Sequence, residues 1–292
     1  MTARFSRVAV LGTGLIGGSF ALAARRAMPG AWVCGWDKPE VLERAVATGV
    51  VDEGHAELGA ALAGADLVFL ALPVGLTIER IPEVARHASS GALVTDAAST
   101  KRAVCAAAEK HFHKSSGARF LGGHPMAGSE ASGLAAADAN LFRGAKYALI
   151  GSETAEEAGL DPRVAGFLEL IEAMGATPMW MDAATHDRAA AIVSHLPQLL
   201  AVALAGVTHE ATDQTGLPLT LAGRGMRDAL RLAGSPYAVW RDIVLTNSDN
   251  LEVALDRIIQ VVEGLRENLR RREMEQEFSV ANEVYKILRD LQ

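Results

Sequence analysis

The sequence predicts an α/β protein in two parts: a doubly wound sheet over residues 1–181 and an all-helical domain over residues 182–292. Two observations carry this prediction. Up to residue 181, short apolar strand patterns alternate with helical patterns, which is typical of a mostly parallel sheet covered by helices. Beyond Asp182 we find no convincing strand pattern, and long stretches carry apolar residues at helical spacing.

A glycine turn follows the first predicted strand. Residues 8–19 read VAVLGTGLIGGS, and a helical pattern begins at once. Gly12 permits a tight turn, Gly14 lets a pyrophosphate approach the backbone, and Gly17 lets the helix pack close to the strand. The start of that helix supplies free N–H groups and a positive dipole end. This arrangement predicts a Rossmann-type dinucleotide site, and the residues expected to hold the cofactor here are Gly12, Gly14, Leu15, Ile16 and Gly17.

The second predicted strand, residues 31–36, ends in Asp37, which follows Gly17 by 20 residues. A carboxylate at this place accepts hydrogen bonds from the adenosine ribose and repels a 2′-phosphate, so the sequence favours NAD over NADP. Lys38 comes directly after Asp37 and keeps NADP as the alternative. No Cys/His spacing indicates a metal site.

The remaining strands of the sheet are short. We expect strands at residues 66–72, 92–95, 119–121, 146–150 and 177–181, and helices at residues 39–48, 77–87, 161–174 and from about residue 101 through Lys110. The run at 66–72, DLVFLAL, is nearly all apolar, as in a parallel strand buried on both faces. Ligands of such sheets lie beyond the carboxyl ends of strands, so Leu72 and Pro73 are assigned to the cofactor.

Helices are expected in the second part at residues 184–208, 219–232, 236–268 and 278–291. In the third, apolar residues recur every three or four positions, at Leu251, Leu255, Ile258, Val262, Leu265 and Leu269. This stripe faces either a core within one subunit or a helix of a second subunit. So much apolar helix surface in a small domain favours a homodimer formed through the helical part.

Composition excludes several classes of function. The chain has 292 residues, half of them hydrophobic, a formal charge of −7 and a pI near 5.7. Without a basic excess, nucleic acid or an anionic membrane is not an expected partner. Cys34 and Cys105 lack a pairing pattern, and no signal sequence is found, so we expect inert thiols in a cytoplasmic protein. Residues 189–207 are long enough to span a bilayer, but polar residues at their centre favour a buried core helix.

Two polar residues follow predicted strand ends, where a ligand is expected. His124 lies in a Gly-Gly-His-Pro turn, and its neutral imidazole could accept a proton from a substrate hydroxyl or merely stabilise the turn. Ser99 could bind that hydroxyl or cap the following helix, a task that Asp96 could also perform. Lys101 could orient a group, neutralise one, or be exposed.

The helical part contributes two further clusters. Ser194, His195 and Gln198 share one face of a helix and either bind a ligand or satisfy one another in the core. A second cluster has helical spacing and offers guanidinium groups that could grip a substrate carboxylate, or form surface ion pairs. Its members are Arg224, Arg227, Asp228 and Arg231.

Together these motifs resemble those of the prephenate/arogenate (cyclohexadienyl) dehydrogenases of tyrosine biosynthesis. The resemblance runs from about residue 7 to residue 268. Its specific parts are VLGTGLIGGS, DAAST-K at residues 96–101, GGHPMAGSE at 122–130, THDRAAAIVSHLPQ at 185–198 and RDALRLAGSPYAVWRDI at 227–243.

The resemblance implies an oxidative decarboxylation with hydride transfer to NAD. His124 would accept the proton of the ring hydroxyl, Ser99 would align that hydroxyl with the cofactor, and Arg231 would bind a substrate carboxylate. Trp240 would help to close the pocket, from its own or a neighbouring subunit, and His195 would support the site. Residues implied to line or brace the substrate pocket are Ser129, Glu130, Ser194, Gln198 and Asp228.

One position departs from the prephenate-specific pattern. Members specific for prephenate carry a second histidine three residues after that of Ser-His-Leu-Pro, where this chain has Gln198. A neutral amide can meet the amino-acid side chain of arogenate, so arogenate, or both acids, is favoured over prephenate alone. The β-hydroxyacid dehydrogenases need a catalytic lysine in the helical part, but no lysine lies between Lys146 and Lys286. A non-catalytic NAD-sensing protein would not need His124, Ser99 and Arg231 together.

Overall fold

The computed structural model describes residues 5–112, 117–128, 131–151, 161–212, 214–271 and 273–290. Within these residues, eight strands form one sheet in the order β3-β2-β1-β4-β5-β6-β7-β8. Every neighbouring pair is parallel except β6 and β7, which are antiparallel. The strands are β1 (Arg7–Leu11), β2 (Trp32–Trp36), β3 (Glu53–His55), β4 (Leu67–Leu70), β5 (Leu93–Asp96), β6 (Arg119–Pro125), β7 (Lys146–Ile150) and β8 (Thr177–Met181). The predicted doubly wound sheet is confirmed.

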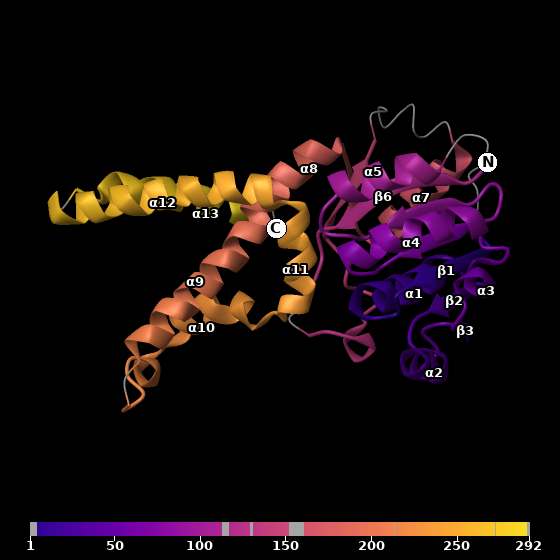
Figure 1. Cartoon of the computed structure of the whole chain (residues 1–292), viewed down its shortest axis with the longest axis horizontal. Helices are drawn as coiled ribbons and strands as arrows, with labels where there is room; N and C mark the ends of the chain where they lie inside the picture. The colour runs from indigo at the N-terminus through magenta and orange to yellow at the C-terminus, as the bar shows by residue number, and fades with distance from the viewer. Residues whose placement is uncertain are drawn as a thin grey trace.

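Helices cover both faces of the sheet (Figure 1). They are α1 (Leu15–Ala27), α2 (Pro39–Ala47), α3 (Leu58–Leu62), α4 (Val74–His87), α5 (Arg102–His111), the 3-10 turn η2 (Leu134–Ala136) and α7 (Pro162–Ala173). The α1 and α7 side chains fill one core, where the Phe20 ring stacks on Phe69 with centroids 3.8 Å apart. On the other side, Leu58, Leu62 and Val84 pack against the central strands. The sequence did not predict β3 and α3, because both are very short.

In the second part, all the regular elements among the described residues are helices or helical turns. It consists of α8 (Ala183–Ala190), the π-helical turn η3 (Ala191–His195), α9 (Leu196–Ala211), the 3-10 turn η4 (Leu219–Leu221), α10 (Arg224–Leu230), the 3-10 turn η5 (Arg231–Gly234), α11 (Tyr237–Thr246), α12 (Ser248–Arg271) and α13 (Glu275–Asp290). The boundary predicted after residue 181 falls between the end of β8 and the start of α8. The helix expected at 236–268 is two helices, which meet at Asn247.

The two parts are joined around α4, α5 and α11. Val74, Ala98 and Ile243 form an apolar cluster there. Polar contacts flank it: the Gly75 N–H donates to Asp242 over 3.1 Å, and the Thr100 and Thr246 hydroxyls are 2.7 Å apart. The carboxyl ends of the parallel strands β1 to β6 therefore face the helical part.

The helix from Ala183 to Ala211 corrects one expectation. It spans 29 residues, and its most apolar window has a mean hydropathy of 1.8. Only 28% of that window is buried. The expected buried core helix is therefore wrong for the single chain. Val193 and Val207 are each 65% exposed, because the helix extends away from the sheet as an arm with α10 packed along it (Figure 1). By length and composition it is the one described helix able to cross a membrane.

Candidate active site

The glycine turn leaves open space where a dinucleotide phosphate is expected. Gly12 has a φ of +91°, and a Cβ there would lie 2.5 Å from the Ala71 carbonyl oxygen. A Cβ on Gly17 would lie 1.8 Å from the Gly12 carbonyl oxygen, so both positions require glycine. At Gly14, by contrast, a Cβ would meet nothing within 4 Å. Since no side chain caps the start of α1, its first N–H groups are available to a phosphate.

Asp37 lies beside this turn, directly after β2. Its Oδ2 accepts hydrogen bonds from the Thr13 N–H (2.7 Å) and hydroxyl (3.1 Å), and its Oδ1 accepts one from the Lys38 N–H (2.8 Å). These bonds fix the carboxylate at the edge of the site. Leu72 packs on the turn, with its Cδ2 2.9 Å from where a Gly12 Cβ would lie, and Pro73 follows on the surface. The expected cofactor residues thus gather at the carboxyl ends of β1, β2 and β4.

His124 is not in a turn, contrary to the prediction. Strand β6 continues to Pro125, and His124 pairs with Ala148 of the antiparallel strand β7. The sequence suggested a shorter strand because glycine and proline surround the histidine. On the other side of β6, Leu121 pairs with Thr95 of β5. Because the strands are parallel, His124 lies level with the residues just before Ser99, as a shared site requires.

The His124 ring contacts a second histidine that the sequence had not singled out. Its Nδ1 lies 2.9 Å from Nε2 of His186 on α8, and the Nδ1 of His186 lies 2.8 Å from the Asp187 carboxylate. Burial, reinforced by His186, Lys101 and His195, lowers the pKa of His124 well below its usual 6.5. His124 is therefore neutral at neutral pH, as a proton acceptor must be.

Asp187 ties this pair to the loop that carries Ser99. Its two carboxylate oxygens accept hydrogen bonds from the backbone N–H groups of Lys101 (2.7 Å) and Arg102 (2.9 Å). Although burial alone raises the pKa of Asp187, its hydrogen bonds to His186 and to these two amides hold it below the usual value. Asp187 therefore stays ionised in the interior.

Lys101 is fully buried, which excludes the exposed alternative. Its Nζ forms an ion pair with Asp96 and donates to the Gly123 carbonyl over 2.6 Å. Asp96 in turn accepts from the Gly123 N–H over 3.1 Å. This buried pair therefore holds both backbone groups of the residue that precedes His124.

The cluster on the helical part lies at the π-helical turn. His195 is buried, its Nδ1 is 3.1 Å from the Asn247 amide nitrogen, and its ring meets Trp240 edge-on at 5.9 Å between centroids. Burial lowers the pKa of His195 to about 4. Among the described residues, neither the Nε2 of His195 nor the Oε1 of the buried Gln198 has a hydrogen-bond partner. Unpaired buried polar atoms one turn apart are typical of a place where a ligand binds.

The family model for the nucleotide-binding domain of prephenate dehydrogenase matches residues 20–177, and that for its dimerization domain matches residues 182–283. The chain belongs to the prephenate dehydrogenase family. It is similar to the prephenate dehydrogenase of Lactococcus lactis, with 35% identity over 86% of this chain and 67% of that protein.

Solved structures of the family have the same fold. The prephenate dehydrogenase of Aquifex aeolicus in complex with hydroxyphenyl propionate and NAD+ has a TM-score of 0.88 and 29% identity, over 100% of both chains. The arogenate dehydrogenase of Synechocystis has a TM-score of 0.76 and 28% identity, over 98% of this chain and 100% of that one. The dinucleotide-binding prediction is confirmed by this family membership, and the first of these relatives carries NAD+.

Some expected residues of this family site are not brought together in the chain. Arg231 and Asp228 are exposed on η5 and α10, as are Arg224 and Arg227, on a segment packed against α9. Ser194 is half-buried within the π-helical turn. Ser129 and Glu130 lie outside the described residues. The roles assigned to all of them stay predictions.

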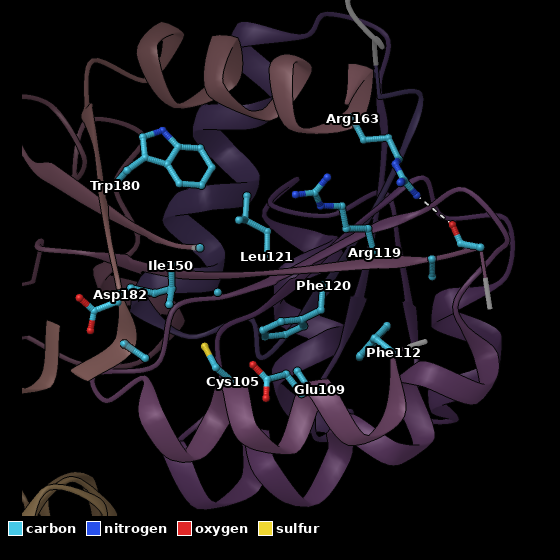
Figure 2. Close-up of a pocket in the computed structure, with 16 residues that line it drawn as sticks. Cys105, Glu109, Phe112, Arg119, Phe120, Leu121, Ile150, Arg163, Trp180 and Asp182 are labelled. Carbon is cyan, nitrogen blue, oxygen red and sulfur yellow. Dashed lines mark hydrogen bonds between the residues drawn. The ribbon is translucent and has the colours of Figure 1, made fainter. Parts of the chain in front are cut away.

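A cavity of about 670 Å³ lies elsewhere, between α5, β6, α7 and the end of β8 (Figure 2). Arg119 and Arg163 on its wall both bind Asp161. Burial raises the pKa of Cys105 at its base to about 12, so this thiol is unreactive. None of the described site residues lines this cavity, so it is separate from the candidate site.

Proposed function

We propose that this protein oxidatively decarboxylates arogenate, alone or together with prephenate, with NAD as the hydride acceptor. The observation that carries the proposal is a neutral His124 beside the Ser99 loop, at the same edge of the sheet as the open glycine turn that follows β1. The names of its relatives support both substrates, since one is a prephenate dehydrogenase and another an arogenate dehydrogenase. A dehydrogenase specific for prephenate is the alternative.

The proposed reaction needs few groups. Bound NAD supplies the hydride acceptor. As hydride leaves the ring carbon that bears the hydroxyl, His124 takes the hydroxyl proton and Ser99 keeps that oxygen aligned. The bond to the ring carboxylate then breaks, CO2 leaves, and the electron pair completes an aromatic ring. The ring oxygen regains a proton as the phenol.

The preference for arogenate rests on Gln198. Its carbonyl oxygen is buried without a partner among the described residues, so it can accept a hydrogen bond from an ammonium group. Arogenate carries an ammonium on its side chain, where prephenate carries a keto group. Arg231, on the turn η5 that packs against α9, is proposed to bind a substrate carboxylate.

We also propose that the protein works as a homodimer in the cytoplasm. The matched family model is that of a dimerization domain, and the arm formed by α9 exposes apolar residues that a second copy can cover. Burial raises the pKa of Cys34 to about 11, which fits an inert thiol in a reducing compartment.

Mixing the purified protein with NAD or NADP and either acid, and following NADH or NADPH absorbance, tests these proposals. We expect turnover of arogenate with NAD, and a higher kcat/KM with NAD than with NADP because Asp37 opposes a 2′-phosphate. Bound NAD without turnover of either acid would indicate a binding protein. A preference for NADP would overturn the assignment of Asp37 and direct attention to Lys38.

A further inference from the structure

The contacts from Asp187 through His186 to His124 set one order of protons when His186 is neutral. An ionised carboxylate can only accept hydrogen bonds, so the His186 nitrogen that faces Asp187, Nδ1, carries the proton. In neutral His186 the other nitrogen, Nε2, is then an acceptor. It lies 2.9 Å from Nδ1 of His124, which must donate to it.

This order leaves the second nitrogen of His124, Nε2, without a proton. The ring is half-buried, and Nε2 forms no hydrogen bond to any residue that the structure describes. We propose that Asp187, acting through His186, is the positioning residue that holds His124 in the tautomer whose Nε2 accepts the substrate proton. This inference rests on the proposed function, since it names what prepares His124 for that role.

Asp187 is well placed to act in this way. It is fully buried, and the backbone N–H groups of Lys101 and Arg102 fix both of its oxygens. The charge of Lys101 is paired with Asp96. Arg102 forms its shorter salt bridge with Asp249, and its Nε also lies 3.4 Å from the Oδ2 of Asp187, while the Oδ1 of Asp187 faces His186. His195 lies at the end of the π-helical turn η3, and its Nδ1 contacts Asn247 and not Asp187.

Loss of the Asp187 carboxylate removes the constraint on which nitrogens of His186 and His124 carry protons. Without an anion at Nδ1, His186 can carry its proton on Nε2 and donate to His124. His124 then holds its own proton on Nε2 and cannot accept one from substrate. The effect reaches the chemical step without requiring any contact between Asp187 and the substrate.

The test compares variants of the full-length enzyme. We expect Asp187→Asn to lower kcat at least tenfold, with an unchanged Kd for NAD and a KM within threefold of wild type. His186→Gln keeps an acceptor for His124 and should retain more activity than His186→Leu, which keeps none. His111→Gln, on the exposed end of α5, is the matched control and should leave kcat unchanged.

A spectroscopic measurement separates this inference from the proposed function. ¹⁵N NMR of histidine-labelled wild type, with the His124 signals assigned by their loss in His124→Asn, should show a proton on Nδ1 and none on Nε2. A proton on Nε2, or equal kcat for His186→Gln and His186→Leu, would overturn the inference even if the enzyme turns over arogenate. The expected tautomer in a protein that oxidises neither acid would uphold the proton order and reject the proposed reaction.

Discussion

At the scale of single residues, the candidate site depends on uncharged polar groups held in fixed orientations. His124 and His195 are both kept neutral by burial, and each uses Nδ1 for a contact within the protein. Their remaining nitrogens, together with the oxygen of Gln198, are then available to a ligand. Substitutions at these positions should therefore alter chemistry and selectivity more than folding.

His124→Ala should remove most of the turnover. A general base contributes about 100- to 10,000-fold to the rate, so we expect a loss of kcat in that range with nearly unchanged NAD binding. Stopped-flow turnover and titration of NAD against the variant measure the two quantities. A loss of less than tenfold would assign His124 a structural role only.

Gln198→His should shift selectivity towards prephenate. An imidazolium would repel the arogenate ammonium, whereas the amide oxygen accepts a hydrogen bond from it; the difference is about 1–3 kcal/mol. The ratio of kcat/KM for the two acids, compared between wild type and variant, measures the shift. An unchanged ratio would mean that Gln198 only packs in the helix and that other residues select the substrate.

At the scale of elements, two features hold the site in place. One is the buried ion pair between Lys101 and Asp96, which fixes β6 to the start of α5, and the other is the π-helical turn between α8 and α9. A π-helical turn inserts one extra residue into a helix and changes which side chains face inwards. Here it places His195 against Asn247 and Trp240, while Asn247 also binds the Asp187 carbonyl over 2.8 Å.

Lys101→Met should destabilise the protein by about 3–5 kcal/mol, because it leaves the Asp96 carboxylate buried without its partner. Urea denaturation followed by circular dichroism measures the change. Lys110→Met is the matched control, since Lys110 is exposed on the same helix, and it should be nearly neutral. Equal effects of the two substitutions would show that the buried pair adds no stability.

His195 should make the fold sensitive to mild acid. Its pKa is about 4 in the folded protein and near 6.5 when unfolded, so stability is complete above pH 6.5 and falls as the pH drops towards 4. Between pH 7 and pH 5, the titration of His195 should lower the free energy of unfolding by about 2 kcal/mol. Urea denaturation at both pH values should show a smaller loss in His195→Gln than in wild type, while the exposed His209→Gln should behave as wild type.

At the scale of the whole molecule, the helical part exposes an unusual amount of apolar surface. On α12 the predicted stripe begins buried at Leu251 but ends exposed, with Val262 at 55% and Leu269 at 67%. Helix α13 lies along α12, with Phe278 and Val280 near Val261 and Leu265, and has no buried residue (Figure 1). The stripe is thus buried where α12 begins and exposed towards its end, the part that we propose a second copy covers.

Val207→Glu should convert the dimer to a monomer, since it places a charge on the exposed face of α9 that we propose a second copy covers. Sedimentation equilibrium measures the mass, with a dimer expected for wild type. Val46→Glu, at another exposed apolar position, on α2, is the control and should remain dimeric. A monomeric wild type that partitions into lipid vesicles would instead assign the apolar helix to a membrane.

The sequence by itself determined the order of strands and helices, apart from the short β3 and α3, and indicated a nucleotide-binding domain. These depend on neighbours in the chain: Gly12, Gly14 and Gly17 lie within one turn, and apolar periodicity is a local property. For the same reason β7 and β8 begin and end where the sequence predicted. His124, Ser99 and Gln198 could be singled out as candidates, because each lies in a distinctive local motif.

Only the tertiary structure decided what surrounds those residues. His124 meets His186 across 62 positions of the chain, and Lys101 meets Asp187 across 86, so no local pattern joins them. The antiparallel pairing with β7 extended β6 through His124, and packing buried Lys101 beside Asp96. Proton positions and burial follow from contacts between distant segments, whereas periodicity and turn chemistry follow from adjacent residues.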